Sequence, residues 1–154
     1  MSLFSRINEE LKESMRKRDV ARTSALRMLK SAIQYSGLEK GRAAGEPLDL
    51  EVIAVIAKEI RKREDSVERY RSGQREDLAR QEEAEIGVLR EFLPEPLSPE
   101  DLESLVRHAI RETGATGKVQ LGAVIKAALQ QAGGRADGKQ VREVADRLLA
   151  TESS

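Results

Sequence analysis

Cysteine is absent from this chain of 154 residues, and histidine occurs once, at His108. Without cysteine the chain has no disulfide, no thiolate ligand for a metal ion and no cysteine nucleophile. Aromatic residues make up only 3% of the sequence. These shortages exclude the disulfide-stabilised secreted proteins and the cysteine-dependent enzymes.

Net charge and long apolar runs are missing as well. The 27 Lys and Arg residues balance 27 Asp and Glu residues, and the longest clear apolar run covers only residues 52–57. A signal peptide and a membrane span both need a longer apolar run than this. We therefore expect a cytoplasmic protein that has no membrane partner.

Charged residues, at 35% of the sequence, are combined with 39% hydrophobic residues. The hydrophobic residues recur at every third or fourth position, which is the spacing of one face of an amphipathic helix. The alternation with period two that indicates strands does not occur. The sequence therefore predicts an all-α protein with no sheet.

Residues 1–93 are predicted to form a four-helix antiparallel bundle. The first helix ends at the basic cluster 16–18, and the second begins after Asp19 as its N-cap and closes near Gly37. Residues 37–48 contain three glycines and one proline without any periodicity. That composition predicts a mobile loop.

The third and fourth helices are predicted to form the longer hairpin of the bundle. Asp49 is expected to cap the third helix and Ser72 to lie at its end. The apolar seam of this helix has the spacing of a coiled-coil stripe. It consists of Val52, Ile56, Ile60, Arg63, Val67 and Tyr70.

A domain boundary is predicted at the linker 94–97. Pro94 and Pro96 cannot continue a helix, and Ser98 followed by Pro99 is a typical helix start with serine as the structural N-cap. Beyond the linker, residues 98–150 are predicted to form a small C-terminal three-helix domain, which is near the lower size limit for independent folding. Its helices are predicted over residues 99–113, 120–131 and 138–150.

Three patterns that resemble functional sites are better explained by ordinary structure. His108 has no second histidine and no glutamate three residues before it, so we interpret it as a surface residue. The acidic residues Glu82, Glu83 and Glu85 are interpreted as the solvated face of a charged helix. Residues 114–118 lack the first glycine and the final Ser/Thr of a phosphate-binding loop. We therefore assign no catalytic residue, no metal ligand and no cofactor.

Positive charge is concentrated in two segments despite the balanced total. Residues 12–30 hold seven basic and two acidic residues, an excess of +5. Residues 118–142 hold five basic residues against Asp137 alone, an excess of +4. The basic residues of this second segment are Lys118, Lys126, Arg135, Lys139 and Arg142.

The start of the last predicted helix combines this charge with free backbone N–H groups, an arrangement that suits phosphate. Asp137 also fits the structural role of N-cap, with Gln140 completing a capping box. Capping explains those two residues and leaves three basic ones unexplained, namely Arg135, Lys139 and Arg142. Phosphate binding and a solvated charge cluster both remain open for them.

Three runs of the sequence resemble YqeY-like proteins of the GatB/YqeY family, namely EIRKREDS at 59–66, LPEPLS at 93–98 and GRADG at 134–138. The similarity extends from Met1 to about Leu149. It implies an N-terminal helical bundle and a small C-terminal domain similar to the tail of the B subunit of tRNA-dependent amidotransferase. In that enzyme the tail engages tRNA and other parts transfer the amide. The matching residues that bear on RNA are Gly134, Arg135, Asp137 and Gly138.

These observations leave three hypotheses for the function. The leading one is a non-catalytic tRNA-binding or tRNA-handling accessory protein, with no DNA partner expected. Its RNA-binding candidates are Arg135, Lys139, Arg142, Lys118, Lys126, Gly134 and Gly138. The second is a helical protein-interaction module, with the hairpin of the third and fourth helices as its contact surface, which the zero net charge favours. The third is a component of a glutamine-dependent carbon–nitrogen ligase that acts only with partner subunits, since no enzyme is expected from this chain alone.

Overall fold

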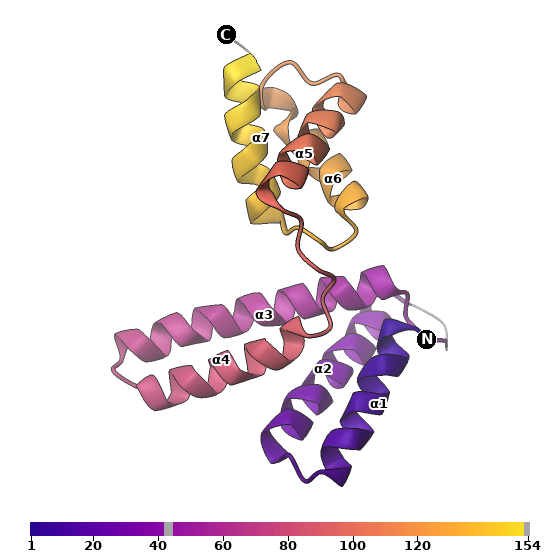
Figure 1. The fold of residues 1–154 in the computed structure, drawn as a ribbon, viewed down its shortest axis with the longest axis vertical. Coiled ribbons are helices and arrows are strands. Elements are labelled where there is room, and N and C mark those ends of the chain that lie inside the picture. Colours follow the sequence, from indigo (N-terminus) through magenta and orange to yellow (C-terminus); the bar gives the residue numbers. More distant parts are fainter. Residues whose placement is uncertain (42–44, 153–154) are drawn as a thin grey trace. The chain divides into compact units, whose positions relative to one another are not determined.

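A computed structural model of the protein describes residues 1–41 and 45–152 (Figure 1). Throughout these residues the regular structure is helical and no strand occurs, which confirms the all-α prediction. The α-helices are α1 (Leu3–Arg16), α2 (Val20–Glu39), α3 (Asp49–Ser72), α4 (Glu76–Arg90), α5 (Pro99–Thr113), α6 (Leu121–Ala132) and α7 (Gly138–Glu152), and a 3₁₀ turn, η1 (Lys118–Gln120), precedes α6.

The chain divides into two compact units, unit 1 (Met1–Leu93) and unit 2 (Pro94–Ser154). Residues 94–97, which the sequence predicts to be a linker, group with unit 2. Each unit has its own cluster of buried hydrophobic residues. Independent folding of the two units remains a prediction. No helix in the described part of the chain has the length and apolar character needed to cross a membrane.

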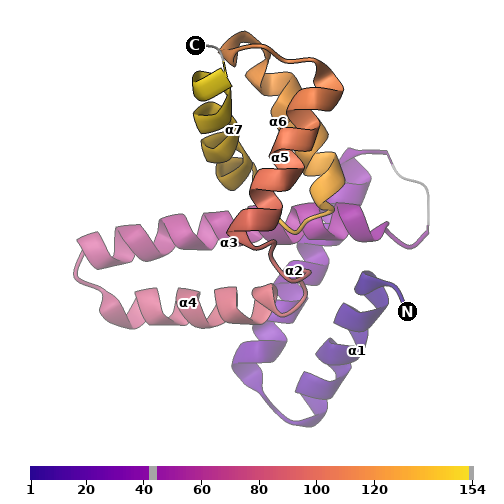
Figure 2. The same cartoon turned by 45° about the horizontal axis from the view of Figure 1, so that its top comes forward.

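Unit 1 consists of two helical hairpins. Helix α1 lies against α2, α3 lies against α4, and α2 also packs on both helices of the second hairpin. The hairpins are inclined to one another, as the views in Figures 1 and 2 both show. The residues of the core include Ile7, Leu11, Leu26, Leu29, Ile33, Val52, Ile56, Ile60, Ile86 and Leu89.

Side chains of α1 and α2 tie the end of α4 to the first hairpin. Arg22 lies 3.0 Å from a carboxylate oxygen of Glu10 and 2.6 Å from one of Glu91. These bonds to carboxylates, foremost that to Glu91, raise the pKa of Arg22 above its ordinary value. Arg6 stacks over the ring of Phe92, with 5.1 Å from its guanidinium carbon to the ring centroid. The two hairpins are therefore joined by charged groups at the rim of the core.

The N-terminus of α3 differs from the sequence prediction. Asp49 is the first residue of the helix, and the N-cap is Leu48. The side chain of Leu48 makes no capping hydrogen bond. The Asp49 carboxylate instead accepts a hydrogen bond from the backbone N–H of Leu3, at 2.9 Å. Asp49 was thus wrongly assigned as the cap of its own helix, because a partner 46 residues away takes its oxygen.

Helix α2 extends past the predicted end at Gly37, which is buried inside the helix. It ends at Glu39, and the chain turns at Gly41, whose φ of 66° is in the left-handed region that glycine adopts without strain. The mobile loop predicted for residues 37–48 therefore begins later than expected. Its residues 42–44 lie outside the described part of the chain.

Unit 2 is a three-helix domain in which α5, α6 and α7 pack on one another. Ser98 caps α5 by accepting a hydrogen bond from the N–H of Asp101, at 3.1 Å. Gly114 ends the same helix with a left-handed φ of 69°. The core residues include Leu102, Val106, Ile110, Val124, Ala128, Val141, Ala145, Leu148 and Leu149.

Candidate nucleic-acid interface

The turn between α6 and α7 carries the central RNA-binding candidates. Gly133 and Gly134 have φ values of 59° and 87°, so both residues lie in the left-handed region. A side chain at either position would be strained there, which explains why glycine stands at both. Helix α6 therefore ends sharply, and the chain reverses into α7 within a few residues (Figure 1).

Asp137 and Gln140 form a reciprocal capping box at the start of α7. The Asp137 carboxylate accepts a hydrogen bond from the N–H of Gln140 at 2.8 Å, and the Gln140 side-chain oxygen accepts one from the N–H of Asp137 at 3.1 Å. The negative charge of Asp137 is therefore held against the helix N-terminus. It does not pair with the basic side chains nearby.

Arg135 holds residues 95–97 against the turn. Its Nε donates a hydrogen bond to the carbonyl of Glu95 at 2.9 Å, and its own carbonyl accepts one from the N–H of Leu97 at 3.0 Å. The residue thus has a structural task in unit 2. The terminal nitrogens of its exposed guanidinium remain available for a second contact.

Lys139 and Arg142 lie in the first two turns of α7, and both are exposed. Neither makes an ion pair or hydrogen bond within the described residues. The buried face of the helix is formed by Val141, Ala145 and Leu148. Together with Arg135, these two residues form a basic surface, the α7 basic surface, next to the positive end of the helix dipole.

Lys118 and Lys126 are exposed but do not belong to this surface. Lys118 is part of η1, before α6, whereas Arg135 follows the end of α6. Helix α6 has 12 residues, and a helix of that length spans about 18 Å. Figure 1 shows the two ends of α6 on opposite sides of unit 2. The candidates therefore form one cluster of three residues and two separate lysines.

Residues 114–118 form a turn between helices. The side-chain oxygen of Gln120 accepts hydrogen bonds from the N–H groups of Thr116 and Gly117, at 3.0 and 3.1 Å. In a phosphate-binding loop such N–H groups point to the ligand. A side chain of the protein occupies them here, which agrees with the rejection of a phosphate loop.

In the first basic segment, residues 12–30, four of the seven basic residues are paired with neighbouring carboxylates. Lys12 lies 3.4 Å from Glu9, and Arg16 lies 2.8 Å from Glu13. Arg22 is held by two carboxylates at the junction of the hairpins. Arg18, Arg27 and Lys30 have no carboxylate partner within the described residues, so the segment keeps three cations that a ligand could use.

Arg63 is a buried charge whose environment the sequence did not reveal. Its side chain in α3 is 7% exposed and lies 3.1 Å from a carboxylate oxygen of Glu59 and 3.0 Å from one of Glu85. A third carboxylate, that of Glu82, is 4.0 Å away. Burial, and secondarily the charge of Glu85, raise the pKa of Glu82 above its ordinary value.

The interpretation of Glu82, Glu83 and Glu85 as one solvated face was therefore wrong. Glu82 and Glu85 are only 24% and 28% exposed, because they turn toward Arg63. Glu83 points elsewhere and pairs with Arg71 at 2.6 Å. The signal was the position of Arg63 in the apolar seam of its helix, since a buried arginine needs carboxylate partners.

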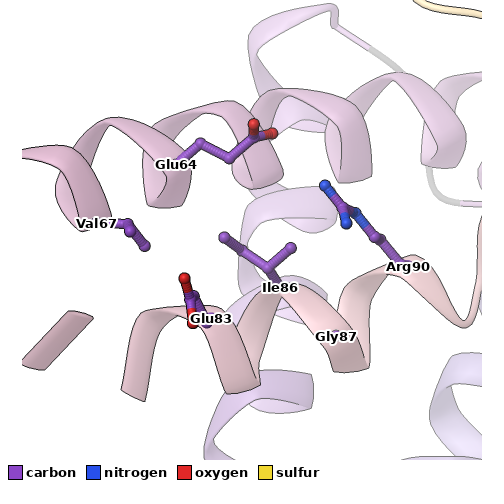
Figure 3. A pocket seen from close by; sticks show the side chains of 6 residues that line it. All are labelled: Glu64, Val67, Glu83, Ile86, Gly87 and Arg90. Carbon is purple, nitrogen blue, oxygen red and sulfur yellow. The ribbon is translucent and has the colours of Figure 1, made fainter. Parts of the chain in front are cut away.

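A groove runs between α3 and α4 beside Glu83. Figure 3 shows its lining, with Glu64 and Arg90 projecting from facing helices near one end. The space beside Gly87 is open, since a Cβ placed there would meet nothing within 4 Å. The lining residues are Glu64, Val67, Glu83, Ile86, Gly87 and Arg90. They do not form a nucleophile and base pair.

His108 is exposed, and its Nε2 lies 3.5 Å from a carboxylate oxygen of Glu112 one turn along α5. This is an ordinary contact within one helix. Among the described residues, His, Asp and Glu side chains form no group of three that could hold a metal ion. The part of the chain that the structure describes therefore offers basic surfaces rather than a metal centre.

The family model of the Yqey-like proteins matches residues 4–149, nearly the entire chain. The chain belongs to this family. The match covers most of both units of this Yqey-like protein, so the family resemblance includes the hairpins of unit 1 and nearly all of the three helices of unit 2.

Fungal relatives of this Yqey-like protein extend the comparison. An uncharacterised protein of Schizosaccharomyces pombe is 37% identical over 94 residues, which are 60% of this chain and 72% of the relative. Proteins named "Altered inheritance of mitochondria protein 41, mitochondrial" are 28% identical in Pyrenophora tritici-repentis and 27% identical in Saccharomyces cerevisiae. The matches cover 87% and 76% of this chain, and 73% and 65% of those relatives.

The expectation of a cytoplasmic protein is corrected by these names. The relatives from Pyrenophora and Saccharomyces are both named as mitochondrial proteins. The original expectation rested on the lack of cysteine and of long apolar runs. Neither feature distinguishes the cytosol from the interior of an organelle.

Proposed function

We propose that this protein is a non-catalytic tRNA-binding accessory protein that contacts RNA phosphates through the α7 basic surface of unit 2. The observation that supports it best is the state of Lys139 and Arg142. Both are exposed and lack a carboxylate partner within the described residues, whereas many cations of unit 1 are paired. The proposal includes a mitochondrial location, which the names of two relatives support.

Electrostatics favour phosphate at this position for two reasons that act together. The start of α7 carries the positive end of the helix dipole, and Lys139 and Arg142 add two full charges beside it. Asp137 directly precedes the helix, and its oxygen is already bound to the N–H of Gln140. Glu143, next to Arg142 in the sequence, is exposed and makes no ion pair with either cation within the described residues. A phosphate group would therefore find donors that the protein itself leaves unused.

Contacts of this kind bind the RNA backbone rather than base edges. We therefore expect affinity that is steeply salt-dependent and nearly independent of base sequence. The resemblance of the C-terminal domain to the amidotransferase tail makes tRNA the RNA to test. Lys118, before the start of α6, and Lys126, near its middle, are candidates for outer contacts, because a nucleic acid wider than the length of α6 can reach beyond the α7 basic surface.

The test is a titration of the full chain with purified tRNA at several salt concentrations. The variant Lys139→Glu/Arg142→Glu should lose most of the affinity. It should also flatten the dependence of log K on log salt by about 1.4 to 1.8, since each phosphate contact contributes roughly 0.7 to 0.9. The matched control, Lys58→Glu/Arg61→Glu on the exposed side of α3, reverses the same charges in unit 1.

Two further variants separate binding from folding. Asp137→Ala should cost about 1 kcal/mol of stability through loss of the cap, without removing positive charge, so tRNA affinity should persist. Arg135→Lys keeps the positive charge but loses the guanidinium that donates a hydrogen bond to the carbonyl of Glu95. The stability of this variant therefore measures how much that hydrogen bond stabilises unit 2. The proposal fails if the Lys139→Glu/Arg142→Glu variant binds tRNA like the parent at every salt concentration.

Absence of catalysis is a separate part of the proposal and has its own assay. The chain has no cysteine, and its one histidine contacts only Glu112 among the interactions described for it. We expect no amide when the pure protein is incubated with glutamine, ATP and misacylated Glu-tRNA. Turnover that a single substitution abolishes, with contaminating enzymes excluded, would refute this part and support the carbon–nitrogen ligase hypothesis.

A further inference from the structure

Methionine carries all of the sulfur in this protein, because the chain has no cysteine. The three methionines Met1, Met15 and Met28 are 94%, 43% and 53% exposed. A peroxide converts a methionine thioether to a sulfoxide, and methionine sulfoxide reductases reverse the reaction. Reversible oxidation at sulfur is therefore confined to these three side chains.

The side chain of Met28 joins helix α2 to a buried cation of α3. Its Sδ atom accepts a hydrogen bond from Nη2 of Arg63, with 3.9 Å between the two atoms. The side chain of Arg63 is 7% exposed, whereas Met28 is 53% exposed. A small oxidant in solution can therefore reach Met28, although its partner is buried.

The three nitrogens of the Arg63 guanidinium differ in their acceptors. Nε donates to a carboxylate oxygen of Glu85 at 3.0 Å, and Nη1 donates to the carbonyl and the carboxylate of Glu59 at 3.3 and 3.1 Å. Within the described residues, Nη2 has the sulfur of Met28 as its acceptor and no oxygen. Thioether sulfur is a weak acceptor, and a buried N–H group without a good partner lowers the stability of the fold. An oxygen atom beside this nitrogen would give Nη2 the strong acceptor that it lacks.

We propose that Met28 is a site of reversible oxidation by a peroxide, and that Nη2 of Arg63 binds the oxygen added to its sulfur. In the reaction a lone pair of the sulfur attacks one oxygen of hydrogen peroxide, and the S–O bond forms as the O–O bond breaks. The second oxygen leaves as hydroxide, takes the proton of the transferred oxygen and becomes water. The sulfur is oxidised by two electrons, and the peroxide is reduced by two.

The distance between sulfur and nitrogen leaves room for the oxygen. An N–H···O hydrogen bond measures about 2.7 to 3.2 Å between its heavy atoms, which is shorter than the 3.9 Å from Sδ to Nη2. An oxygen on the side of the sulfur that faces Arg63 therefore comes within hydrogen-bond distance. The bonds to Glu59 and Glu85 can persist, because they use Nη1 and Nε.

Met15 provides an internal comparison, because its sulfur also lies against an arginine. The distance from Sδ of Met15 to Nη2 of Arg27 is 3.3 Å. Arg27 is exposed, however, so water can serve as an acceptor for this nitrogen. A sulfoxide at Met15 would replace water with another oxygen, which brings little net stabilisation. Burial of the guanidinium thus distinguishes Met28 from Met15.

Oxidation of Met28 is expected to stabilise the folded protein, contrary to the usual effect of a sulfoxide. A sulfoxide usually disrupts packing, since it places a polar oxygen among apolar side chains. At Met28 the oxygen gains a buried donor, and one net hydrogen bond corresponds to about a fivefold lower unfolding equilibrium constant. The contact between α2 and α3 therefore tightens when a peroxide adds the oxygen and relaxes when a reductase removes it.

The test compares Met15→Leu and Met28→Leu in the full chain, each before and after complete oxidation with hydrogen peroxide. Leucine and methionine have similar volumes, so both variants should fold like the parent. Peptide mass spectrometry identifies the oxidised residues, and urea unfolding gives the equilibrium constant. Oxidation should lower this constant about fivefold in Met15→Leu, where Met28 is oxidised, and leave it unchanged in Met28→Leu. Met1 is present in both variants and cancels in the comparison.

Arg63→Lys tests the partner of the added oxygen. Lysine keeps the positive charge but lacks Nη2, so oxidation should bring no gain in stability in this variant. Since a substitution at a buried position can prevent folding, a second measurement uses Met15→Leu, which retains Arg63. Nuclear magnetic resonance of its arginine side chains should show slower exchange of the Arg63 Nη2 protons with water after oxidation. Treatment with a methionine sulfoxide reductase should restore the initial exchange rate.

Several outcomes would overturn the inference. They are an unchanged or higher unfolding constant after oxidation of Met28, an equal gain in Met28→Leu, a gain that persists in Arg63→Lys, and unchanged proton exchange at Arg63. Resistance of Met28 to peroxide that oxidises Met15 completely, or a sulfoxide that the reductase leaves in place, would also overturn it. The inference does not depend on RNA binding, since Met28 lies in unit 1 and the α7 basic surface in unit 2.

Discussion

The Nε atom of Arg63 in α3 lies 3.0 Å from a carboxylate oxygen of Glu85 in α4. The surrounding side chains bury Arg63, which as a whole residue is only 6% exposed. This pair links the two helices of the longer hairpin across their packed faces. The carboxylates of Glu59 and Glu82 lie beside the same guanidinium of Arg63. One positive charge thus serves three carboxylates.

Arg63→Met is expected to destabilise the protein strongly. The change introduces an apolar side chain of similar length, which leaves Glu82 and Glu85 without a cation and Glu59 with Lys62 alone, at 3.5 Å. Removing one partner of a buried ion pair costs about 3 to 5 kcal/mol, and we expect the lower end because the carboxylates are partly exposed. Urea unfolding measures the loss, with Arg61→Met, at an exposed position two residues away, as control.

The contribution of Glu85 can be isolated by a double-mutant cycle. Glu85→Gln should cost stability in the parent and much less in the Arg63→Met background, because the interaction is already gone. Equal costs in the two backgrounds would show that Glu85 acts independently of Arg63.

Glu82→Gln is expected to stabilise the protein at neutral pH. The folded-state pKa of Glu82 is raised above its ordinary value of 4.5, first by burial and then by the charge of Glu85. A raised pKa means that the folded state holds the proton more tightly than the unfolded state. Glu82 therefore favours folding below about pH 4.5, and this contribution is lost as the pH rises through the folded-state pKa.

The measurement is the free energy of unfolding of parent and Glu82→Gln at several pH values. The variant, neutral throughout, should exceed the parent near pH 7, and its advantage should shrink as the pH falls toward 4. Glu64→Gln removes the same charge at an exposed position and serves as control. A variant less stable than the parent at pH 7 would mean that attraction to Arg63 outweighs burial.

Asp49→Ala should lower the free energy of unfolding by about 0.5 to 1.5 kcal/mol, the net value of a hydrogen bond. The loss should arise at the N-terminus of α1. The lost bond is the one from the N–H of Leu3, so hydrogen exchange should accelerate at the first turn of α1 rather than in α3. Asp65→Ala, at an exposed position inside α3, is the matched control. Faster exchange confined to α3 would contradict the cross-helix role of Asp49.

Local signals in the sequence predicted the helix ends that depend on neighbouring residues. Ser98 and Asp137 bind N–H groups three residues ahead, so their partners can be read from the sequence itself. Asp49 has the same residue type and a similar position but binds Leu3 instead. Sequence patterns do not encode which distant N–H group comes near, because that depends on how the two hairpins pack.

The buried charge of Arg63 was also predictable from the sequence only in part. The seam of α3 predicted that Arg63 faces the core, yet its partners depend on the register between α3 and α4. The exposed apolar residues of α2, such as Met28 and Tyr35, do not follow from the same pattern. Leu26, Leu29 and Ile33 satisfy the helical period by themselves and form the buried face.

The two units are expected to unfold separately, with the boundary between Leu93 and Pro94. Fragment 1–93 contains the larger core and should fold alone, as a cooperative thermal transition followed by circular dichroism. A weakly helical fragment with a non-cooperative melt would place the boundary elsewhere or show that unit 1 needs unit 2.

Unit 2 provides the sharper test of that boundary, because residues 94–97 are bound to it. Arg135 donates to the carbonyl of Glu95, and its carbonyl accepts from Leu97. Fragment 94–154 should therefore be more stable than fragment 98–154 by about 1 to 3 kcal/mol, the net value of two hydrogen bonds. Arg135→Ala in fragment 94–154 should remove part of the difference, since only the bond from Nε depends on the side chain. Equal stabilities of the two fragments would mean that residues 94–97 are a linker that does not contribute to the stability of unit 2.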